Sequence, residues 1–288
     1  MNEIIQSIVG GLALGAEYAL MALGFSLVFG ILRVINFAHG AFYVVGGYFA
    51  YWVTHTLGMP YVVGVVVAVL GTAAIGYLFE LFIVERRVDD HLATIVLTVG
   101  ASLIGSAAML ALFGPQAVQF KAILTGSLHL GGVYVPHARL MTIVVAIAAV
   151  GAVYVLLYRT RLGNALRALT DDREMALAMG MRPKVLFPAA FGIATGLAGL
   201  TGALVTPQFS LAPFVGESVL SISFLTVILG GLGSLSGAVI AAVLVGLVQS
   251  FVGTYIGGSW ASLILFSVIL VVLVVRPSGL LGHRTVNA

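Results

Sequence analysis

The twenty residues 139–158, RLMTIVVAIAAVGAVYVLLY, carry a single charge, at their first position. An α-helix rises about 1.5 Å per residue, so about 20 apolar residues cross the hydrocarbon core of a bilayer, which is roughly 30 Å thick. A run of this length without further charges is typical of a transmembrane helix and not of a helix buried in a soluble protein. The stretch therefore predicts that the chain crosses a membrane.

Similar runs recur along the whole chain, and together with residues 139–158 they number nine. The other eight are Ile4–Leu32, 38–57, 61–84, 92–113, 186–206, 218–232, 238–256 and 260–275. The first run is long for one span and contains Gly10, Gly11, Gly15 and Glu17, so it crosses either once or, in two pieces, twice. Residues 218–232 are short for a crossing and fit a broken or re-entrant segment. We therefore predict an all-α, polytopic integral membrane protein, a helical bundle with eight to ten transmembrane helices.

The composition supports this fold class. Of 288 residues, 61% are hydrophobic and only 8% are charged, against about 25% charged in an ordinary soluble domain. A soluble domain of this size needs a charged surface that this chain cannot supply, so lipid must surround much of it. The absence of cysteine excludes disulfides, thiolate metal sites and a cysteine nucleophile. We predict one membrane domain, residues 1–288, without a cleaved signal peptide, because Met1-Asn2-Glu3 lacks a positive n-region.

The positions of the 13 Lys and Arg residues predict the orientation. If the N-terminus is outside and each run crosses once, the outer loops carry Lys121 and Arg139. The inner loops then carry the other eleven: Arg33, Arg86, Arg87, Arg159, Arg161, Arg167, Arg173, Arg182, Lys184, Arg276 and Arg284. Cytoplasmic loops are enriched in Lys and Arg. We therefore predict a cytoplasmic C-terminus and an N-terminus on the other side of the membrane.

The inner loop at about residues 159–185 contains the clearest local pattern. Asp171 is a candidate N-cap, with Glu174 at the N3 position of a capping box. Gly180 is placed to end the helix in a left-handed cap. These residues predict a short helix over 172–179, outside the bilayer. Because so short a helix is marginal alone, it needs a second surface, either a partner protein or lipid headgroups, and the loop's residues leave both open.

Three motifs carry a resemblance to a known family. The inner loop resembles the coupling motif of ABC importer permeases, in which a short helix docks into a cleft of the ATPase subunit. Residues 35–40, INFAHG, resemble a signature of the branched-chain amino acid permeases, and residues 230–238, GGLGSLSGA, resemble their second, glycine-rich signature. All three occur in the family's order, and the similarity covers essentially the whole chain. The chain thus resembles the H-type permease subunit of the high-affinity branched-chain amino acid ABC importer family.

The resemblance implies a transport subunit and not an enzyme. Such a permease forms the translocation pathway for branched-chain or other hydrophobic amino acids in the bacterial inner membrane, with a periplasmic N-terminus and a cytoplasmic C-terminus. The implied partners are a second, M-type permease in a heterodimer, two ATPase subunits that bind ATP and Mg²⁺, and a periplasmic substrate-binding protein. The chain itself is expected to hold no cofactor. The residues implied in coupling to the ATPases are Arg167, Ala168, Asp171, Glu174, Ala176 and Gly180.

Six further residues are candidates for lining the pathway or for breaking helices: Glu17, Asn36, His39, Gly231, Gly233 and Ser234. A carboxylate in mid-membrane costs at least a few kcal/mol unless it faces protein or water. Glu17 therefore either pairs with the substrate ammonium or a basic group of the sister permease, or lies near an interface at a helix break. Asn36 and His39 either line the inner mouth or satisfy free backbone groups at a break. His39 is not expected to bind a metal, because no second ligand lies at i+4.

Other functional classes fit the sequence less well. The chain has no Gly-x-x-x-x-Gly-Lys-Ser/Thr motif, so it does not hydrolyse ATP itself. No His-Glu-x-x-His motif and no nucleophile–base pair in a span supports a membrane hydrolase. A channel or an ion-coupled secondary transporter would need more buried carboxylates than Glu17. Since related permeases carry urea or other small amides, that substrate class stays an alternative.

Overall fold

The computed structural model describes residues 2–88, 90–120, 126–130 and 133–282. Lys121 and Arg284, which entered the orientation argument, lie outside these residues. The described chain forms α-helices, short π- and 3₁₀-helical extensions and one β-hairpin. The α-helices are α1 (Asn2–Leu32), α2 (His39–Tyr51), α3 (Tyr61–Phe79), α4 (His91–Phe113), α5 (His137–Arg159), α6 (Arg161–Asp171), α7 (Arg173–Ala178), α8 (Pro183–Val205), α9 (Val215–Gly230), α10 (Leu235–Tyr255) and α11 (Gly258–Val275). The remaining elements are the π-helices η1 (Trp52–Thr56) and η2 (Glu80–Val84), the 3₁₀-helix η3 (Glu85–Arg87), and strands β1 (Ser127–Leu130) and β2 (Val133–Pro136).

Each of the nine predicted apolar runs is helical. Within the described residues, seven helices are long and apolar enough to cross a membrane, namely α1, α3 with its extensions, α4, α5, α8, α10 and α11. The other two runs form shorter helices: α2 has 13 residues and continues into η1, and α9 has 16 residues. The prediction of a polytopic, all-α membrane bundle is therefore confirmed.

Helix α1 is one continuous helix of 31 residues, so the division of the first run into two pieces is wrong. Its glycines permit close packing and do not break the helix. A Cβ built on Gly11 would lie 2.8 Å from Leu247 Cα, and one on Gly15 would lie 2.9 Å from Val243 Cα. Small residues let membrane helices approach backbone to backbone, and here they join α1 to α10.

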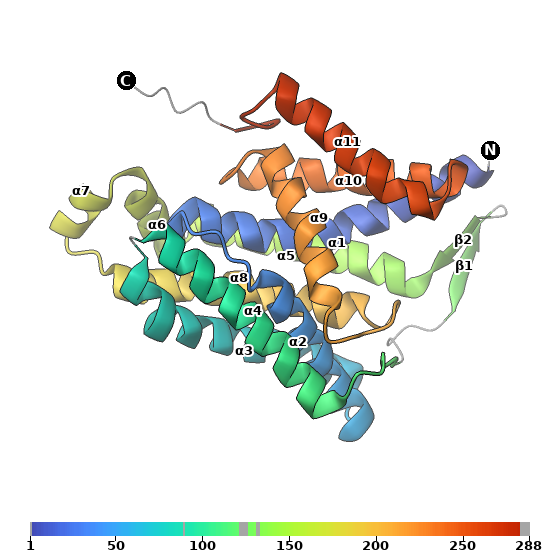
Figure 1. Ribbon diagram of the computed structural model, residues 1–288, viewed down its shortest axis with the longest axis horizontal. Coiled ribbons are helices and arrows are strands. Elements are labelled where there is room, and N and C mark those ends of the chain that lie inside the picture. Colours follow the sequence, from blue (N-terminus) through green and yellow to red (C-terminus); the bar gives the residue numbers. More distant parts are fainter. Residues whose placement is uncertain (1, 89, 121–125, 131–132, 283–288) are drawn as a thin grey trace.

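The long helices run side by side, with α1 crossing the middle of the molecule and α11 at its edge (Figure 1). Helices α6 and α7 lie at one end of the molecule, and the β-hairpin lies at the other, beside the N-terminus (Figure 1). Two hydrogen bonds fix this second end, from Gln6 Nε2 to the Tyr134 carbonyl oxygen (2.8 Å) and from Tyr134 N–H to Gln6 Oε1 (3.0 Å). The start of α1 is thus tied to the hairpin, at the end of the molecule opposite α7.

The predicted loop helix exists, but its start differs from the prediction. Asp172 is the N-cap of α7, and its carboxylate accepts from Met175 N–H (3.0 Å). Asp171 is instead the last residue of α6, a helix that the sequence analysis missed. Helix α6 starts after Thr160, whose Oγ1 accepts from Gly163 N–H (3.1 Å), and it runs on through the position assigned to the cap.

The C-terminal cap of α7 agrees with the prediction. Gly180 has a φ of +82°, the left-handed conformation in which glycine has no steric penalty. Its N–H donates to Leu177 O (2.9 Å), and Met181 N–H donates to Ala176 O (3.1 Å). These two bonds satisfy carbonyls at the helix end, so glycine at position 180 lets the chain turn from α7 towards α8.

Candidate functional site

Two helix breaks meet at the end of the bundle that carries α6 and α7. One break separates α1 from α2 at residues 33–38, and the other separates α9 from α10 at residues 231–234. A Cβ built on Gly30, in the last turn of α1 before the first break, would lie 3.4 Å from Gly233 Cα, so the end of α1 meets the second break closely. The INFAHG and glycine-rich motifs, which lie far apart in the sequence, therefore belong to one structural unit.

In the first break, Asn36 and His39 are fully buried and contact backbone groups. Asn36 Oδ1 accepts from Ala38 N–H (3.0 Å), and His39 Nε2 lies 3.2 Å from the Met21 carbonyl oxygen of α1. The Phe25 ring of α1 meets His39 edge-on at 5.9 Å. The Asn36 bond satisfies a backbone N–H at the break, whereas Asn36 Nδ2 and His39 Nδ1 are buried without a partner among the described residues.

In the second break, Ser234 caps α10 by accepting from Gly237 N–H (3.1 Å) at its Oγ. Gly231 has a φ of +104°, and a Cβ there would lie 2.4 Å from Gly282 N in the segment after α11. That segment is held by Leu280 N–H, which donates to Leu229 O (2.8 Å), among other bonds. Glycine at position 231 thus permits both the positive φ of the turn and the close approach of the C-terminal segment.

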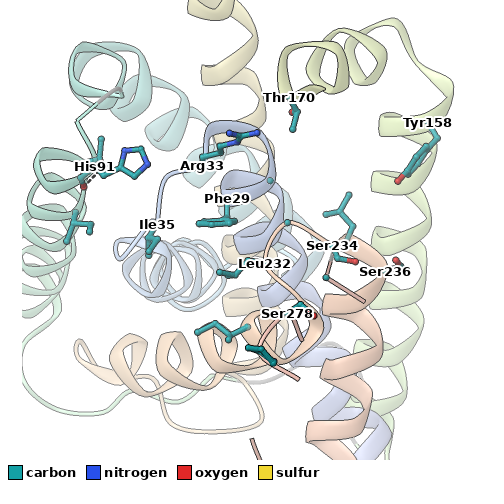
Figure 2. Close-up of a pocket in the computed structure, with 18 residues that line it drawn as sticks. Phe29, Arg33, Ile35, His91, Tyr158, Thr170, Leu232, Ser234, Ser236 and Ser278 are labelled. Carbon is teal, nitrogen blue, oxygen red and sulfur yellow. Dashed lines mark hydrogen bonds between the residues drawn. The ribbon is translucent and has the colours of Figure 1, made fainter. Parts of the chain in front are cut away.

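Around the two breaks lies a cavity of about 850 Å³. Of the candidates for the pathway or a helix break, Gly233 and Ser234 line it, whereas Asn36 and His39 do not. Figure 2 shows Arg33 above Phe29, with His91 on one side and Thr170 and Ser234 on the other. The remaining labelled lining residues are Ile35, Tyr158, Leu232, Ser236 and Ser278. Arg33 was not among the predicted site residues, although it stands two residues before the INFAHG motif.

A second cavity of about 410 Å³ adjoins the first and reaches the helices of the inner loop. The coupling candidates Asp171 and Glu174 line it. Three residues line both cavities: Arg33, His91 and Thr170. These three residues thus form a wall between the cavity at the two helix breaks and the cavity at the start of α7.

The other coupling candidates lie on α6 and α7. The Arg167 guanidinium donates to Asn164 Oδ1 (2.7 Å) and lies 4.7 Å from the centre of the Tyr158 ring, a cation–π contact. Ala168 is partly buried, and Ala176 is the one buried residue of α7. Around Ala176, the apolar side chains of Met175, Leu177 and Met179 are 45–63% exposed. This apolar surface of α7 is not covered by the described chain.

Glu17 lies apart from these residues, in an unbroken part of α1, so its placement at a helix break is wrong. It is buried, and Arg139 at the start of α5 acts on it electrostatically. Next to it, Tyr18 donates to Gln249 Oε1 of α10 (2.6 Å). Glu17 lines neither of the two cavities. The carboxylate therefore lies within electrostatic reach of Arg139 of α5 and Tyr43 of α2, protein groups such as a charge within a membrane needs.

The bundle, its paired helix breaks and the cavity between them define a multi-pass membrane protein of the permease class. The family model described as the branched-chain amino acid transport system permease component matches residues 7–274. The chain therefore belongs to the family of branched-chain amino acid transport system permeases.

Individual relatives agree with this assignment over nearly the whole chain. The high-affinity branched-chain amino acid transport system permease BraD of Pseudomonas aeruginosa is 29% identical, over 98% of this chain and 97% of the relative. LivH of Escherichia coli K12, of the same description, is 26% identical over the same shares. LivM of E. coli K12 is 27% identical, over 92% of this chain and 67% of the relative. Among solved structures, PsaBC of Streptococcus pneumoniae in complex with Fab gives a TM-score of 0.47 at 17% identity, covering 96% of this chain and 91% of that one.

Proposed function

We propose that the chain is the H-type permease of an ABC importer and moves branched-chain amino acids across the bacterial inner membrane. Separate ATPase subunits, which bind ATP and Mg²⁺, drive it, and a periplasmic binding protein delivers the substrate. The observation that carries this proposal is the apolar surface of α7, which stands exposed at one end of a membrane bundle. The family membership and the names of the relatives support the substrate class.

The surface of α7 fits a protein partner better than lipid headgroups. Met175, Leu177 and Met179 are exposed around a six-residue helix whose first residues are charged. A six-residue helix gains little stability from its own hydrogen bonds. Exposed apolar groups rimmed by polar residues are typical of a protein–protein contact. We therefore assign α7, with its capped ends, as the element that docks onto an ATPase subunit.

Helix α6 connects α7 mechanically to the helices of the bundle. Its Leu166 and Leu169 are buried in the main hydrophobic core, to which α1 and α8 also contribute. Only Asp172 separates α6 from α7, and its N–H donates to Ala168 O (3.1 Å). A displacement of α7 by the ATPase would thus move α6 and bear on α1 and α8. The described contacts support a mechanical path from α7 to the two helix breaks.

Similarity to both LivH and LivM supports a second, related permease as partner. If α7 is cytoplasmic, the N-terminus is periplasmic, because Gln6 ties it to the hairpin at the opposite end. The binding protein would then dock on the side of the hairpin. Reporter fusions to the two chain ends test this orientation, and a cytoplasmic signal from the N-terminal fusion would contradict it.

Replacement of Gly180 by Trp tests the docking of α7. Nothing lies within 4 Å of a Cβ at this position, so the bulk would project into open space and obstruct only a partner. Gly180→Ala is the matched control, because both variants carry the strain of a positive φ, about 1 kcal/mol. We expect Gly180→Trp to abolish leucine uptake and ATPase stimulation, while Gly180→Ala keeps most of both. Normal transport by Gly180→Trp at equal membrane abundance would reject the assignment of α7.

Replacement of Glu17 by Gln tests whether this carboxylate serves the pathway. The substitution removes the charge and keeps the shape, so packing around Tyr18 and Gln249 is preserved. We expect uptake to fall if Glu17 attracts the substrate ammonium. Unchanged uptake would leave Glu17 a structural partner of Arg139.

A further inference from the structure

Arg33 has a backbone conformation that suits glycine better than arginine. It is the one non-glycine residue with a positive φ (+55°) among the residues that the structure describes. Its N–H donates to Phe29 O (2.9 Å) and closes the last turn of α1. Glycine usually occupies this left-handed position after a helix, and other residues there carry a steric cost from their Cβ. The turn alone therefore does not account for arginine, whose side chain must supply something else.

The guanidinium of Arg33 lies at the wall between the two cavities. It makes no hydrogen bond or ion pair with any residue in the described ranges, and its side chain is exposed. A cation at the C-terminus of α1 does interact favourably with the helix dipole. However, a lysine or arginine elsewhere in the last turn, without backbone strain, would serve that purpose equally well.

The larger cavity is positively charged and amphipathic. Its lining includes Arg33 and no Asp or Glu. Hydroxyl groups come from several different helices and segments: Thr94, Tyr158, Thr170, Ser234, Ser236 and Ser278. Apolar side chains line the rest: Phe29, Ile35, Ile95, Ile228, Leu232 and Leu235. Ser234 Oγ accepts a capping bond, so its O–H is free to donate into the cavity.

We propose that Arg33 binds the carboxylate of the transported amino acid in this cavity, on the α7 side of the pathway. The guanidinium matches a carboxylate in charge and in its planar, two-pronged shape. The free O–H of Ser234 supplies a further donor, and Phe29 with Leu232 offers apolar surface to an aliphatic side chain. A volume of about 850 Å³ holds such a molecule together with water. The inference rests on the proposed function and adds a position for the substrate.

The test compares Arg33→Gly, Arg33→Lys and the wild type in the complete complex. Arg33→Gly removes the side chain and relieves the backbone strain, so the protein should fold at least as well. A purely structural role therefore predicts normal transport by this variant. If Arg33 binds the carboxylate, we expect Arg33→Gly to lower the affinity for tritiated leucine by at least about tenfold, since hydrogen bonds to charged groups contribute about 1.5–3 kcal/mol. Arg33→Lys should fall between the two.

Binding is measured on the complex in nanodiscs without the binding protein, and uptake is measured in proteoliposomes with it. Leucinamide, which lacks the carboxylate, should compete poorly with leucine in the wild type and equally with it in Arg33→Gly. Nanodiscs of phosphatidylcholine alone and with phosphatidylglycerol separate a substrate carboxylate from a net anionic lipid headgroup. A loss of affinity that appears only with phosphatidylglycerol would assign Arg33 to lipid and overturn the inference.

The outcomes also separate this inference from the proposed function. If the wild type takes up leucine and Arg33→Gly binds and transports it equally well, the carboxylate site is wrong and the importer stands. If the wild-type complex takes up no branched-chain amino acid, the proposed substrate class fails and the site with it.

Discussion

Helices α8 and α4 have the same length, 23 residues, and opposite surroundings. Over their most apolar windows, 72% of α8 is buried within the protein and 17% of α4. The buried helix is nevertheless the less apolar of the two. In a soluble protein the order would be reversed, because apolar surface is driven from water. Lipid removes that driving force, so apolarity does not decide which helix lies at the centre.

Small residues instead decide which helix lies at the centre. Helix α8 carries glycines at 192, 196, 199 and 202 and threonines at 195 and 201, all on or near its packed faces. A Cβ on Gly199 would lie 2.8 Å from Ala68 O of α3, and one on Gly202 would lie 2.0 Å from Tyr43 O of α2. By contrast, nothing lies within 4 Å of a Cβ on Gly100 of α4. Close approach of backbones therefore distinguishes the centre of this bundle from its exposed rim.

The largest expected effect follows from placing the same substitution on both helices. Gly202→Val would force its side chain into the backbone of α2, and we expect a loss of about 3 kcal/mol or more in the free energy of unfolding. Gly100→Val in α4 should change it by less than about 0.5 kcal/mol. Thermal unfolding of the detergent-purified permease measures both. Equal stability of the two variants would show that the glycines of α8 do not hold the centre.

A second pair compares leucines of the same two helices. Leu197 in α8 is 8% exposed, and Leu112 in α4 is 72% exposed. We expect Leu197→Ala to cost about 2 kcal/mol, because it leaves a cavity that the packed neighbours fill only in part. Leu112→Ala should cost less than about 0.5 kcal/mol, since lipid chains fill the space. The midpoints of unfolding in SDS titrations should separate in the same order, and a larger effect at Leu112 would contradict the assigned faces.

The smallest expected effect concerns hydrogen bonds from threonines of α8 and α4. Thr195 Oγ1 lies 3.1 Å from Thr72 O of α3 and 3.0 Å from Phe191 O of its own helix. Thr98 Oγ1 of α4 lies 3.4 Å from Ile35 O in the first break and 3.1 Å from Ile95 O of its own helix. Interhelical bonds of this kind contribute about 0.6 kcal/mol on average and rarely above 1.7. We expect Thr195→Val to cost about 1 kcal/mol and Thr98→Val less, because its bond is longer. Proteolysis of the folded permease at increasing temperature detects differences of this size, and the reverse order would argue against a bond from Thr195.

Much of the fold was predictable from local patterns. Apolar runs bounded by charges gave all nine helical segments, because the backbone in lipid must satisfy its hydrogen bonds within each helix. Gly180 was assigned correctly as the C-terminal cap of α7, since that role depends only on its own φ. Asp171 was assigned wrongly as a cap because Thr160, eleven residues earlier, starts a helix that runs through it. The identity of a cap depends on where the preceding helix ends, which the loop residues alone do not reveal.

The candidate site was predictable only in part. Gly231, Gly233 and Ser234 stood out as a motif, and the structure places the last two at the cavity. Arg33 and His91 did not stand out, because a lone Arg or His at a span end is typical of any inner loop. Their significance comes from the close approach of two segments about 200 residues apart, Gly30 with Gly233, and from the positive φ of Arg33.

By itself the sequence determined that this is a membrane protein, where its nine apolar helical runs lie and that α7 ends at Gly180. Each of these properties depends on residues within one or two helical turns, and on the cost of placing charge or free backbone in lipid. Only the tertiary structure decided which helices form the centre, that Glu17 lies near Arg139 of α5, and that Arg33 lines a cavity. Those properties depend on which backbones meet, and in lipid that choice is made by shape, through contacts between distant glycines, and not by hydrophobicity.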